Sequence, residues 1–175
     1  MFRRLIIVTL ACLLVLGGTS FAQQKFGYVN SQTILGELPE AQDAQKKLNV
    51  EVQAAQDSID SMQKSLQARL EDYQKRQAML TDAAKKEEEQ KLFDGDQAIK
   101  QFQQAKFGQN GQIAQEREKL FAPIRDRIVK AIQVVAKEER MQFILDKTPD
   151  VALLLYADPQ FDMTYKVLDR LKRGK

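Results

Sequence analysis

A stripe of apolar residues recurs at helical spacing between residues 48 and 73. Successive members are three or four residues apart, close to one α-helical turn of about 3.6 residues. The positions between them are mostly Gln, Lys, Asp, Glu and Ser, so the stripe is narrow and one partner helix can cover it, as in a coiled coil. We expect a long helix that begins at Pro39, whose ring suits the first helical position. The stripe comprises Leu48, Val52, Ala55, Ile59, Met62, Leu66, Leu70 and Tyr73.

A second stripe of similar spacing follows after a turn, which predicts an antiparallel helical hairpin. Two segments compete for the turn. At 80–82, Thr81 can cap the next helix, whereas at 94–96 a glycine lies between two aspartates. The second stripe comprises Leu92, Ile99, Phe102, Ile113, Leu120, Ile124, Ile128, Ile132 and Val135.

The second stripe has a gap that contains Gly108 and Gly111, and Pro123 follows it. Proline inside a helix removes a hydrogen bond and favours a bend. We expect a hinge at these three residues that lets the distal hairpin splay, so that alanine at both glycines would raise thermal stability. The alternative is that the glycines admit the other helix closely, in which case alanine would clash with that helix.

Short strand patterns flank the hairpin. They lie at 25–30, at 142–146 and at 151–157, where VALLLYA is apolar on both faces and predicts a covered central strand. Asp162 can cap a last helix with an apolar side of Met163, Val167, Leu168 and Leu171. The predicted fold is α+β and mainly α, with a hairpin arm at 39–120 on a small β body at 23–38 and 121–175.

The strands carry more apolar surface than one chain of this size can cover. Exposed strand edges pair readily with other chains, so we expect a closed homo-oligomer. Three copies supply nine strands, enough for a small barrel, whereas two copies leave an edge that is harder to close. We expect a homotrimer, in which Leu153→Asp would cause dissociation. The residues expected to hold it are Val29, Phe143, Leu145, Leu153 and Leu155.

The segment 1–22 has the pattern of a secretory signal peptide. Arg3 and Arg4 precede a twelve-residue apolar run, and small residues lead to Ala22. As a helix the run would span about 18 Å, whereas the hydrocarbon of a bilayer is about 30 Å thick. A permanent transmembrane anchor is therefore the weaker interpretation. We therefore expect export to the periplasm with cleavage after Ala22. A lipoprotein cut before Cys12 is the alternative, which its flanking residues fit less well.

The composition excludes most catalytic chemistry. The 175 residues suffice for one domain and include no His and no Trp, so imidazole catalysis and His-ligated zinc are excluded. The chain has no phosphate-binding Gly-Lys loop, and 94–105 lacks the Gly and Glu of a calcium loop. Loss of Arg3 and Arg4 would lower the formal charge from +3 to about +1, which does not suggest nucleic-acid binding. We expect no enzyme activity, cofactor or metal.

Soft apolar side chains are scattered along the predicted hairpin. Most of them suit the seam between the helices. Those off the seam, especially Phe93 and Phe107, are candidates for weak, adaptable contacts with apolar segments of another protein. Because many such contacts would share the binding energy, no single residue is expected to dominate. The candidates are Phe93, Phe102, Phe107, Met62 and Met79.

Several stretches together resemble the Skp/OmpH family of periplasmic chaperones for outer-membrane proteins, over essentially the whole mature chain. The most specific stretches are those at the C-terminal end, whereas the Gln- and Lys-rich hairpin alone matches many coiled coils. The stretches are FGYVN at 26–30, Leu120-x-x-Pro123-Ile124, FILDK at 143–147, LLYADP at 154–159 and FDMTYKVLDRL at 161–171.

The resemblance implies an ATP-independent holdase. Its fold would be a trimer with a small β-barrel body and three hairpin arms around a cavity for unfolded outer-membrane β-barrel proteins. The best-known members have basic arms, but these arms are near neutral, so we expect at most a weak contact with the membrane surface or lipopolysaccharide. Arg140-Met141 stands where glycine is often found, so we expect that turn to be built differently.

A second class of function is a structural coiled-coil adaptor that tethers cell-envelope components. An adaptor would present one continuous exposed apolar stripe along the arm, whereas a chaperone would leave its inner faces polar. The gap between Phe102 and Ile113 favours the chaperone.

Overall fold

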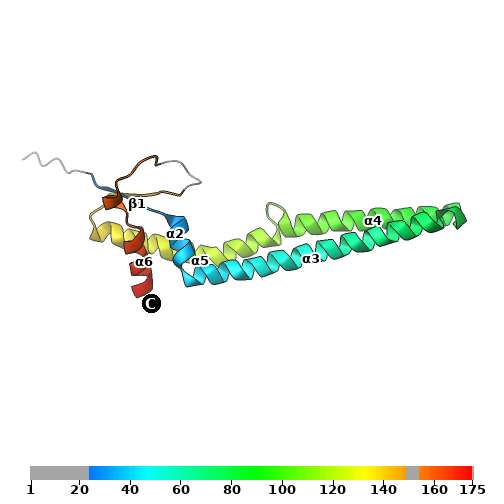
Figure 1. Cartoon of the computed structure of the whole chain (residues 1–175), viewed down its shortest axis with the longest axis horizontal. Coiled ribbons are helices and arrows are strands. Elements are labelled where there is room, and N and C mark those ends of the chain that lie inside the picture. The colour runs from blue at the N-terminus through cyan, green and yellow to red at the C-terminus, as the bar shows by residue number, and fades with distance from the viewer. Residues whose placement is uncertain (1–23, 149–153, 175) are drawn as a thin grey trace, which may run out of the picture.

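The computed structural model describes residues 24–148 and 154–174, so the predicted signal peptide and its cleavage site lie outside the described residues. A long hairpin extends from a small body (Figure 1), and the predicted α+β, mainly helical fold is confirmed. The elements in order are β1 (Phe26–Val29), α2 (Ser31–Glu37), α3 (Pro39–Arg76), the 3₁₀ turn η1 (Gln77–Met79), α4 (Asp82–Phe107), α5 (Gln112–Glu138), β2 (Phe143–Asp146), the 3₁₀ turn η2 (Pro159–Phe161) and α6 (Thr164–Arg173).

The helix α3 begins at Pro39 as predicted and runs unbroken for 38 residues, a length of about 57 Å. It lies alongside α4 (Figure 1). The chain reverses at 77–81, where Thr81 Oγ1 accepts a hydrogen bond from the Ala84 amide at 3.3 Å. The turn is therefore at the first of the two predicted segments. The other segment, 94–96, lies inside α4.

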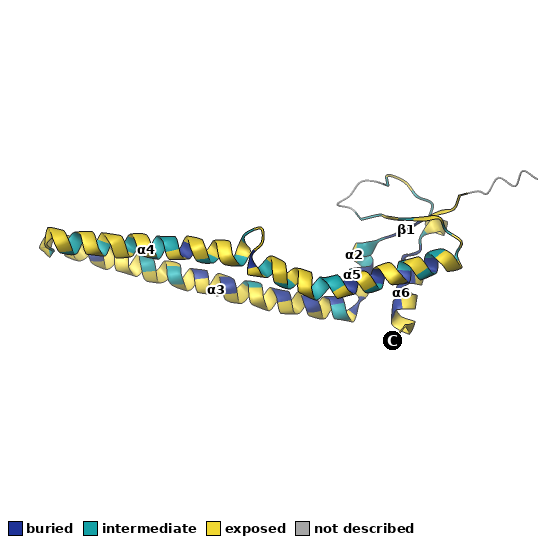
Figure 2. Cartoon of the chain, turned by 180° about the vertical axis from the view of Figure 1, so that it is seen from behind, coloured by how far each residue is buried: buried dark blue, intermediate teal, exposed yellow. Residues whose placement is uncertain are grey.

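The predicted seam of the hairpin is confirmed. Leu48, Ala55, Ile59 and Tyr73 are buried along α3, and Ile99 is buried on α4. The Tyr73 hydroxyl donates to Glu89 Oε1 at 2.7 Å. This bond, with a smaller effect from burial, raises the pKa of Tyr73 above its ordinary value of 10.0. Buried residues follow the facing sides of the helices and exposed residues cover the rest (Figure 2).

The returning half of the hairpin is two helices, because α4 ends before Gly108 and α5 starts after Gly111. A loop at 108–111 projects from the hairpin on the side away from α3 (Figure 1). The helix α5 then continues through Pro123. Of the three residues of the expected hinge, the helix is therefore interrupted at Gly108 and Gly111 and is continuous at Pro123.

The core of the body lies where α6 packs across α2 and α5. Ile34 and Val167 are both 0% exposed, and the predicted apolar side of the last helix is confirmed. The core residues are Val29, Ile34, Leu38, Ala41, Ala44, Ile124, Ile128, Ala131, Val135, Met163, Val167, Leu168 and Leu171.

The Arg127 guanidinium links three helices at the base of the arm. One amino group is paired with Glu40 of α3, and Nη2 donates to the Leu171 carbonyl of α6 at 2.9 Å. At the C-cap of α5, Glu139 accepts from Lys166 Nζ at 2.6 Å. Because these contacts join α6 to α5 and α3, they hold the body to the start of the hairpin.

The sheet has two parallel strands, with Phe26 opposite Phe143 and Val29 opposite Asp146. The strands predicted near 25–30 and 142–146 are thus confirmed. Residues 154–157 of the third predicted strand belong to no helix or strand, whereas 151–153 lie outside the described residues. The covered central strand expected here is therefore not formed by 154–157 in the single chain, where these residues have no strand partner.

The start of α2 is fastened to the end of β2. The Ser31 amide and hydroxyl donate to the Asp146 carboxylate at 3.1 and 2.5 Å. The cap of α2 is Asn30, whose Oδ1 accepts from the Thr33 amide at 2.9 Å. Asp162 Oδ1 accepts from the Thr164 amide at 2.8 Å in the first turn of α6.

The turn between α5 and β2 is a Schellman motif. The Met141 amide donates to the Ala136 carbonyl at 2.8 Å, and the Arg140 amide donates to the Lys137 carbonyl at 3.2 Å. Arg140 has a φ of 54°, which is the left-handed conformation that glycine usually supplies. The turn is therefore built like a glycine turn, contrary to our expectation, with arginine in the strained position.

Arg140→Gly is expected to stabilise the chain by about 0.5–1 kcal/mol, because the left-handed backbone costs an L-residue more than it costs glycine. Urea unfolding would measure the change. Arg140→Ala is the control, since it removes the side chain but keeps the strain, and it should bring no gain. A loss of stability in the glycine variant would contradict a strained turn.

Candidate functional site

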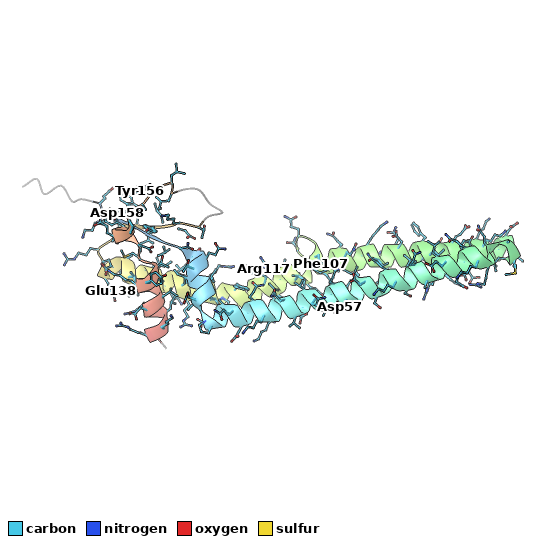
Figure 3. All side chains as sticks on the ribbon, in the orientation of Figure 1. Asp57, Phe107, Arg117, Glu138, Tyr156 and Asp158 are labelled. Carbon is cyan, nitrogen blue, oxygen red and sulfur yellow. The ribbon has the colours of Figure 1, made fainter. Side chains whose placement is uncertain are left out.

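The body exposes an apolar surface around its sheet. The Phe26 and Phe143 rings stack with centroids 5.2 Å apart, and both rings are about half exposed. Leu155 is 92% exposed. Tyr156 and Asp158 lie beside the sheet, on the segment that leads into η2 (Figure 3). This sheet surface consists of Phe26, Phe143, Leu145, Leu155, Tyr156 and Phe161.

A hollow of about 470 Å³ lies next to this sheet surface. Phe26, Leu145, Leu154 and Tyr156 form much of its apolar lining. Large exposed apolar patches mark interaction sites. The apolar lining of the hollow is therefore typical of a surface that binds apolar groups.

The two edges of the small sheet differ. The Tyr28 carbonyl of β1 accepts a hydrogen bond from the Met163 amide at 2.8 Å, and Tyr28 also forms a bridge with Asp162. β1 thus has neighbours on both sides. β2 has β1 as its one strand neighbour within the described residues. β2 is therefore an edge strand that can accept a further strand.

Tyr28 is one of the residues that line the hollow. The Lys147 Nζ lies 4.9 Å from the centroid of its ring, a cation–π distance. Burial, followed by the nearby Asp162 carboxylate, raises the pKa of the Tyr28 hydroxyl above its ordinary value. The hydroxyl therefore stays neutral at physiological pH.

The arm surface is mainly polar. Glutamines donate to carboxylates one turn away, as in Gln53 to Asp57 at 2.8 Å and Gln67 to Glu71 at 2.9 Å. Ion pairs such as Lys100–Asp96 at 2.6 Å follow the same spacing. Such local pairs stabilise a helix by a few tenths of a kcal/mol each. Part of the arm's charge is therefore paired within the same helix.

The chain also matches a known family. The sequence profile of the family described as Outer membrane protein (OmpH-like) matches residues 25–171. The chain belongs to the OmpH-like family. A comparison with curated proteins found no match.

A solved structure from Caulobacter crescentus, described as a proposed outer membrane chaperone (OmpH-like), is similar in fold to this OmpH-like chain. The two have a TM-score of 0.68 and 14% sequence identity, and the match covers 91% of this chain and 90% of the other. At this identity the likeness concerns the fold.

The structure separates the candidate contact residues of the arm into two groups. Met79 at the tip is 79% exposed and Phe93 on α4 is 58% exposed. Phe107, also exposed, is at the end of α4 beside the break (Figure 3). Met62 and Phe102 are partly buried, and Lys106 Nζ lies 5.5 Å from the centroid of the Phe102 ring. Met79, Phe93 and Phe107 are therefore accessible to a partner. Met62 and Phe102 contribute to the seam.

The residues predicted to hold the oligomer are also divided. Phe143, Leu145 and Leu155 are exposed, whereas Leu153 lies outside the described residues. Val29 is only 3% exposed and packs in the core of its own chain. In the single chain Val29 therefore belongs to the core and, unlike Phe143, Leu145 and Leu155, is not exposed to another subunit.

Val129 and Val50 are among the exposed apolar residues that were not singled out in the sequence. Val129 on α5 is half exposed. Val50 projects from α3 outside the seam. Its place between the stripe positions Leu48 and Val52 was the available signal.

The glycines of the expected hinge have a role that neither sequence hypothesis described. A Cβ on Gly108 would overlap the Gln104 carbonyl oxygen, and one on Gly111 would lie 2.7 Å from the Lys106 carbonyl oxygen. Both obstacles belong to the last turn of α4 and not to the opposite helix. Glycine is thus needed for the chain to fold back on the end of α4.

The described residues do not contain a metal site. Within 24–148 and 154–174, no three His, Cys, Asp or Glu side chains gather as ligands. In the same part of the chain, each helix is too short or too polar to span a bilayer.

Proposed function

We propose that this OmpH-like protein is an ATP-independent holdase chaperone of the periplasm. It binds unfolded outer-membrane β-barrel proteins in a cavity between helical arms and prevents their aggregation, without a catalytic step. The observation that carries the proposal is a long, mainly polar arm with separate exposed apolar side chains, joined to a body whose sheet surface is uncovered. The description of the Caulobacter crescentus structure as a proposed chaperone supports it.

The binding mode follows from the arm surface. Met79, Phe93 and Phe107 lie at the tip, on the outer half of α4 and beside the break, with polar residues between them. Methionine and phenylalanine contact varied apolar surfaces without a fixed shape. Such a surface binds many unfolded segments weakly. It does not favour the adaptor hypothesis, which needs a continuous apolar stripe.

A homotrimer would complete the body. In this arrangement 23–38 and 121–175 form the oligomerisation body and 39–120 the arm. The β2 edge, the exposed Leu145 and Leu155, and Val129 on α5 supply the surface that two other copies cover. Three projecting arms would then enclose the cavity, and flexibility at Gly108, Gly111 and Pro123 would allow it to widen. Removal of 1–22 after Ala22 would accompany export, which the mass of the mature protein would test.

The direct test is a light-scattering assay with a urea-unfolded β-barrel membrane protein diluted into buffer without nucleotide. The mature protein should suppress scattering at a stoichiometric excess of trimer. An equal mass of an unrelated soluble protein in place of the mature protein is the control for non-specific protection. Equal aggregation with and without the intact protein would overturn the proposal.

We expect Phe93→Ala to weaken client binding by less than about 1 kcal/mol, because an exposed side chain shares the interaction with many others, unlike a hot spot. Titration of a labelled unfolded client would measure the change in Kd. Lys91→Ala, on the same helix, is the matched control for loss of helix-surface contacts. A tenfold loss from Phe93→Ala alone, a change of about 1.4 kcal/mol, would support an adaptor with a fixed docking site.

A further inference from the structure

The chain has three asparagines, and they occupy different environments. Asn30 caps α2, Asn49 is inside α3, and Asn110 is in the loop at 108–111. The residues that follow them are Ser31, Val50 and Gly111 respectively. These differences determine which side-chain amide can react with its own backbone.

The reaction concerned is intramolecular deamidation. The backbone nitrogen of the next residue attacks the asparagine Cγ, an N–C bond forms, and ammonia leaves with the side-chain nitrogen. Water then opens the resulting five-membered succinimide at one of its two carbonyls, which yields aspartate or isoaspartate. The attack requires the asparagine backbone to leave helical geometry, and it is least hindered when the next residue is glycine, which has no Cβ and a freely rotating backbone.

Asn30 and Asn49 are both held against this reaction. Asn30 Oδ1 accepts from the Thr33 amide at 2.9 Å, which fixes its side chain as a cap. Asn49 Oδ1 accepts from Gln45 Nε2 at 2.7 Å. It also lies within an unbroken helix before the β-branched Val50, so its backbone cannot turn toward Cγ without breaking the helix.

Asn110 has none of these restraints. It is exposed and lies outside α4 and α5. Its backbone carbonyl, and not its side-chain amide, accepts a hydrogen bond from Gln115 Nε2 at 2.8 Å. The nucleophilic nitrogen of Gly111 donates to the Gly108 carbonyl at 2.8 Å. Opening of this short loop frees that nitrogen. Exposed loops are the elements that open at the lowest cost.

We propose that Asn110 is a self-modification site of the arm, at which the chain deamidates through attack by its own Gly111 nitrogen. The site is next to Phe107 and the break (Figure 3). The aspartate product adds a negative charge just before α5, whose first residues have no side-chain cap. The isoaspartate product adds a methylene to the backbone of the link between α4 and α5. Both products change the part of the arm at which the helices are separated, and the reaction itself does not depend on the proposed function.

Peptide mapping of the mature protein after incubation in mildly alkaline buffer tests this. Trypsin cleavage after Lys106 and Arg117 isolates 107–117, which contains Asn110 alone among the asparagines. This peptide should gain the mass difference between OH and NH₂ and separate into aspartate and isoaspartate forms. The peptides with Asn30 and Asn49 should stay unchanged. Asn110→Gln should abolish the new forms, and Asn110→Asp should co-elute with one of them.

The same incubation in urea provides the reference rate for the unfolded chain. Modification of 107–117 in the folded protein, with isoaspartate present, supports the proposal. If 107–117 is modified in urea but unchanged in the folded protein, the loop protects Gly111 and the proposal is wrong. An aspartate product without isoaspartate would indicate direct hydrolysis and would also overturn it.

Discussion

Leu145→Asp is expected to sediment as a single folded chain, whereas the unsubstituted mature protein should sediment as the proposed trimer. Leu145 is opposite Tyr28 on the open edge strand β2 and is 41% exposed in the single chain. Burial of a leucine side chain contributes about 1.5–3 kcal/mol, and each copy would lose this at its interface. The introduced carboxylate would also have to leave water without a partner.

Because Leu145 is outside the core of the chain, the variant should keep the helical circular dichroism of the parent. Val50→Asp is the matched control, since Val50 is an exposed apolar residue on the arm and not on the body. This control should stay trimeric. A trimeric Leu145→Asp protein would show that β2 is not the interface, whatever the arms bind.

Alanine at both Gly108 and Gly111 is expected to destabilise the arm, in the opposite direction from a simple helix-propensity argument. Neither glycine is in a helix, and each new Cβ would meet a backbone oxygen at the end of α4. Backbone cannot yield as a flexible side chain can, so overpacking of this kind costs about 1–3 kcal/mol at each site. Thermal and urea unfolding would measure the loss.

Gly36→Ala is the control for that pair. Gly36 lies inside α2 and has open space where a Cβ would be placed, so alanine there should stabilise by about 0.5–1 kcal/mol. Gly95→Ala tests a third situation, because its Cβ would meet only the end of the Leu66 side chain, at 2.9 Å, which can rotate away. A higher melting temperature for the Gly108 and Gly111 pair would mean that the loop becomes helical in solution.

The loop at 108–111 also refines the hinge proposed for the cavity. The helix α3 is continuous beside the break, so separation of α4 and α5 leaves one helix to carry the arm. Bending would therefore require α3 to curve while the loop opens. The aspartate or isoaspartate expected at Asn110 would alter that opening without changing the body.

The features that could be predicted from the sequence are those with a local period. The stripe from Leu48 to Tyr73 defined the seam and α3, the apolar side of Val167 and Leu171 defined α6, and Pro39 marked a helix start. A helix buries a face at about 3.6-residue spacing whatever covers it. The contact candidates Phe93 and Phe107 followed in the same way, because they fall outside the stripe.

The tertiary structure decided which surfaces are covered and where the chain departs from regular geometry. Val29 is buried because it packs in a core built from residues of α2, α3, α5 and α6, and 154–157 have no strand partner within the single chain. α5 continues through Pro123, which is exposed, so water can bind the carbonyl that its missing amide leaves unpaired. Arg140 takes a left-handed φ because α5 and β2 must connect there. These outcomes depend on contacts between distant segments, which a local pattern does not contain.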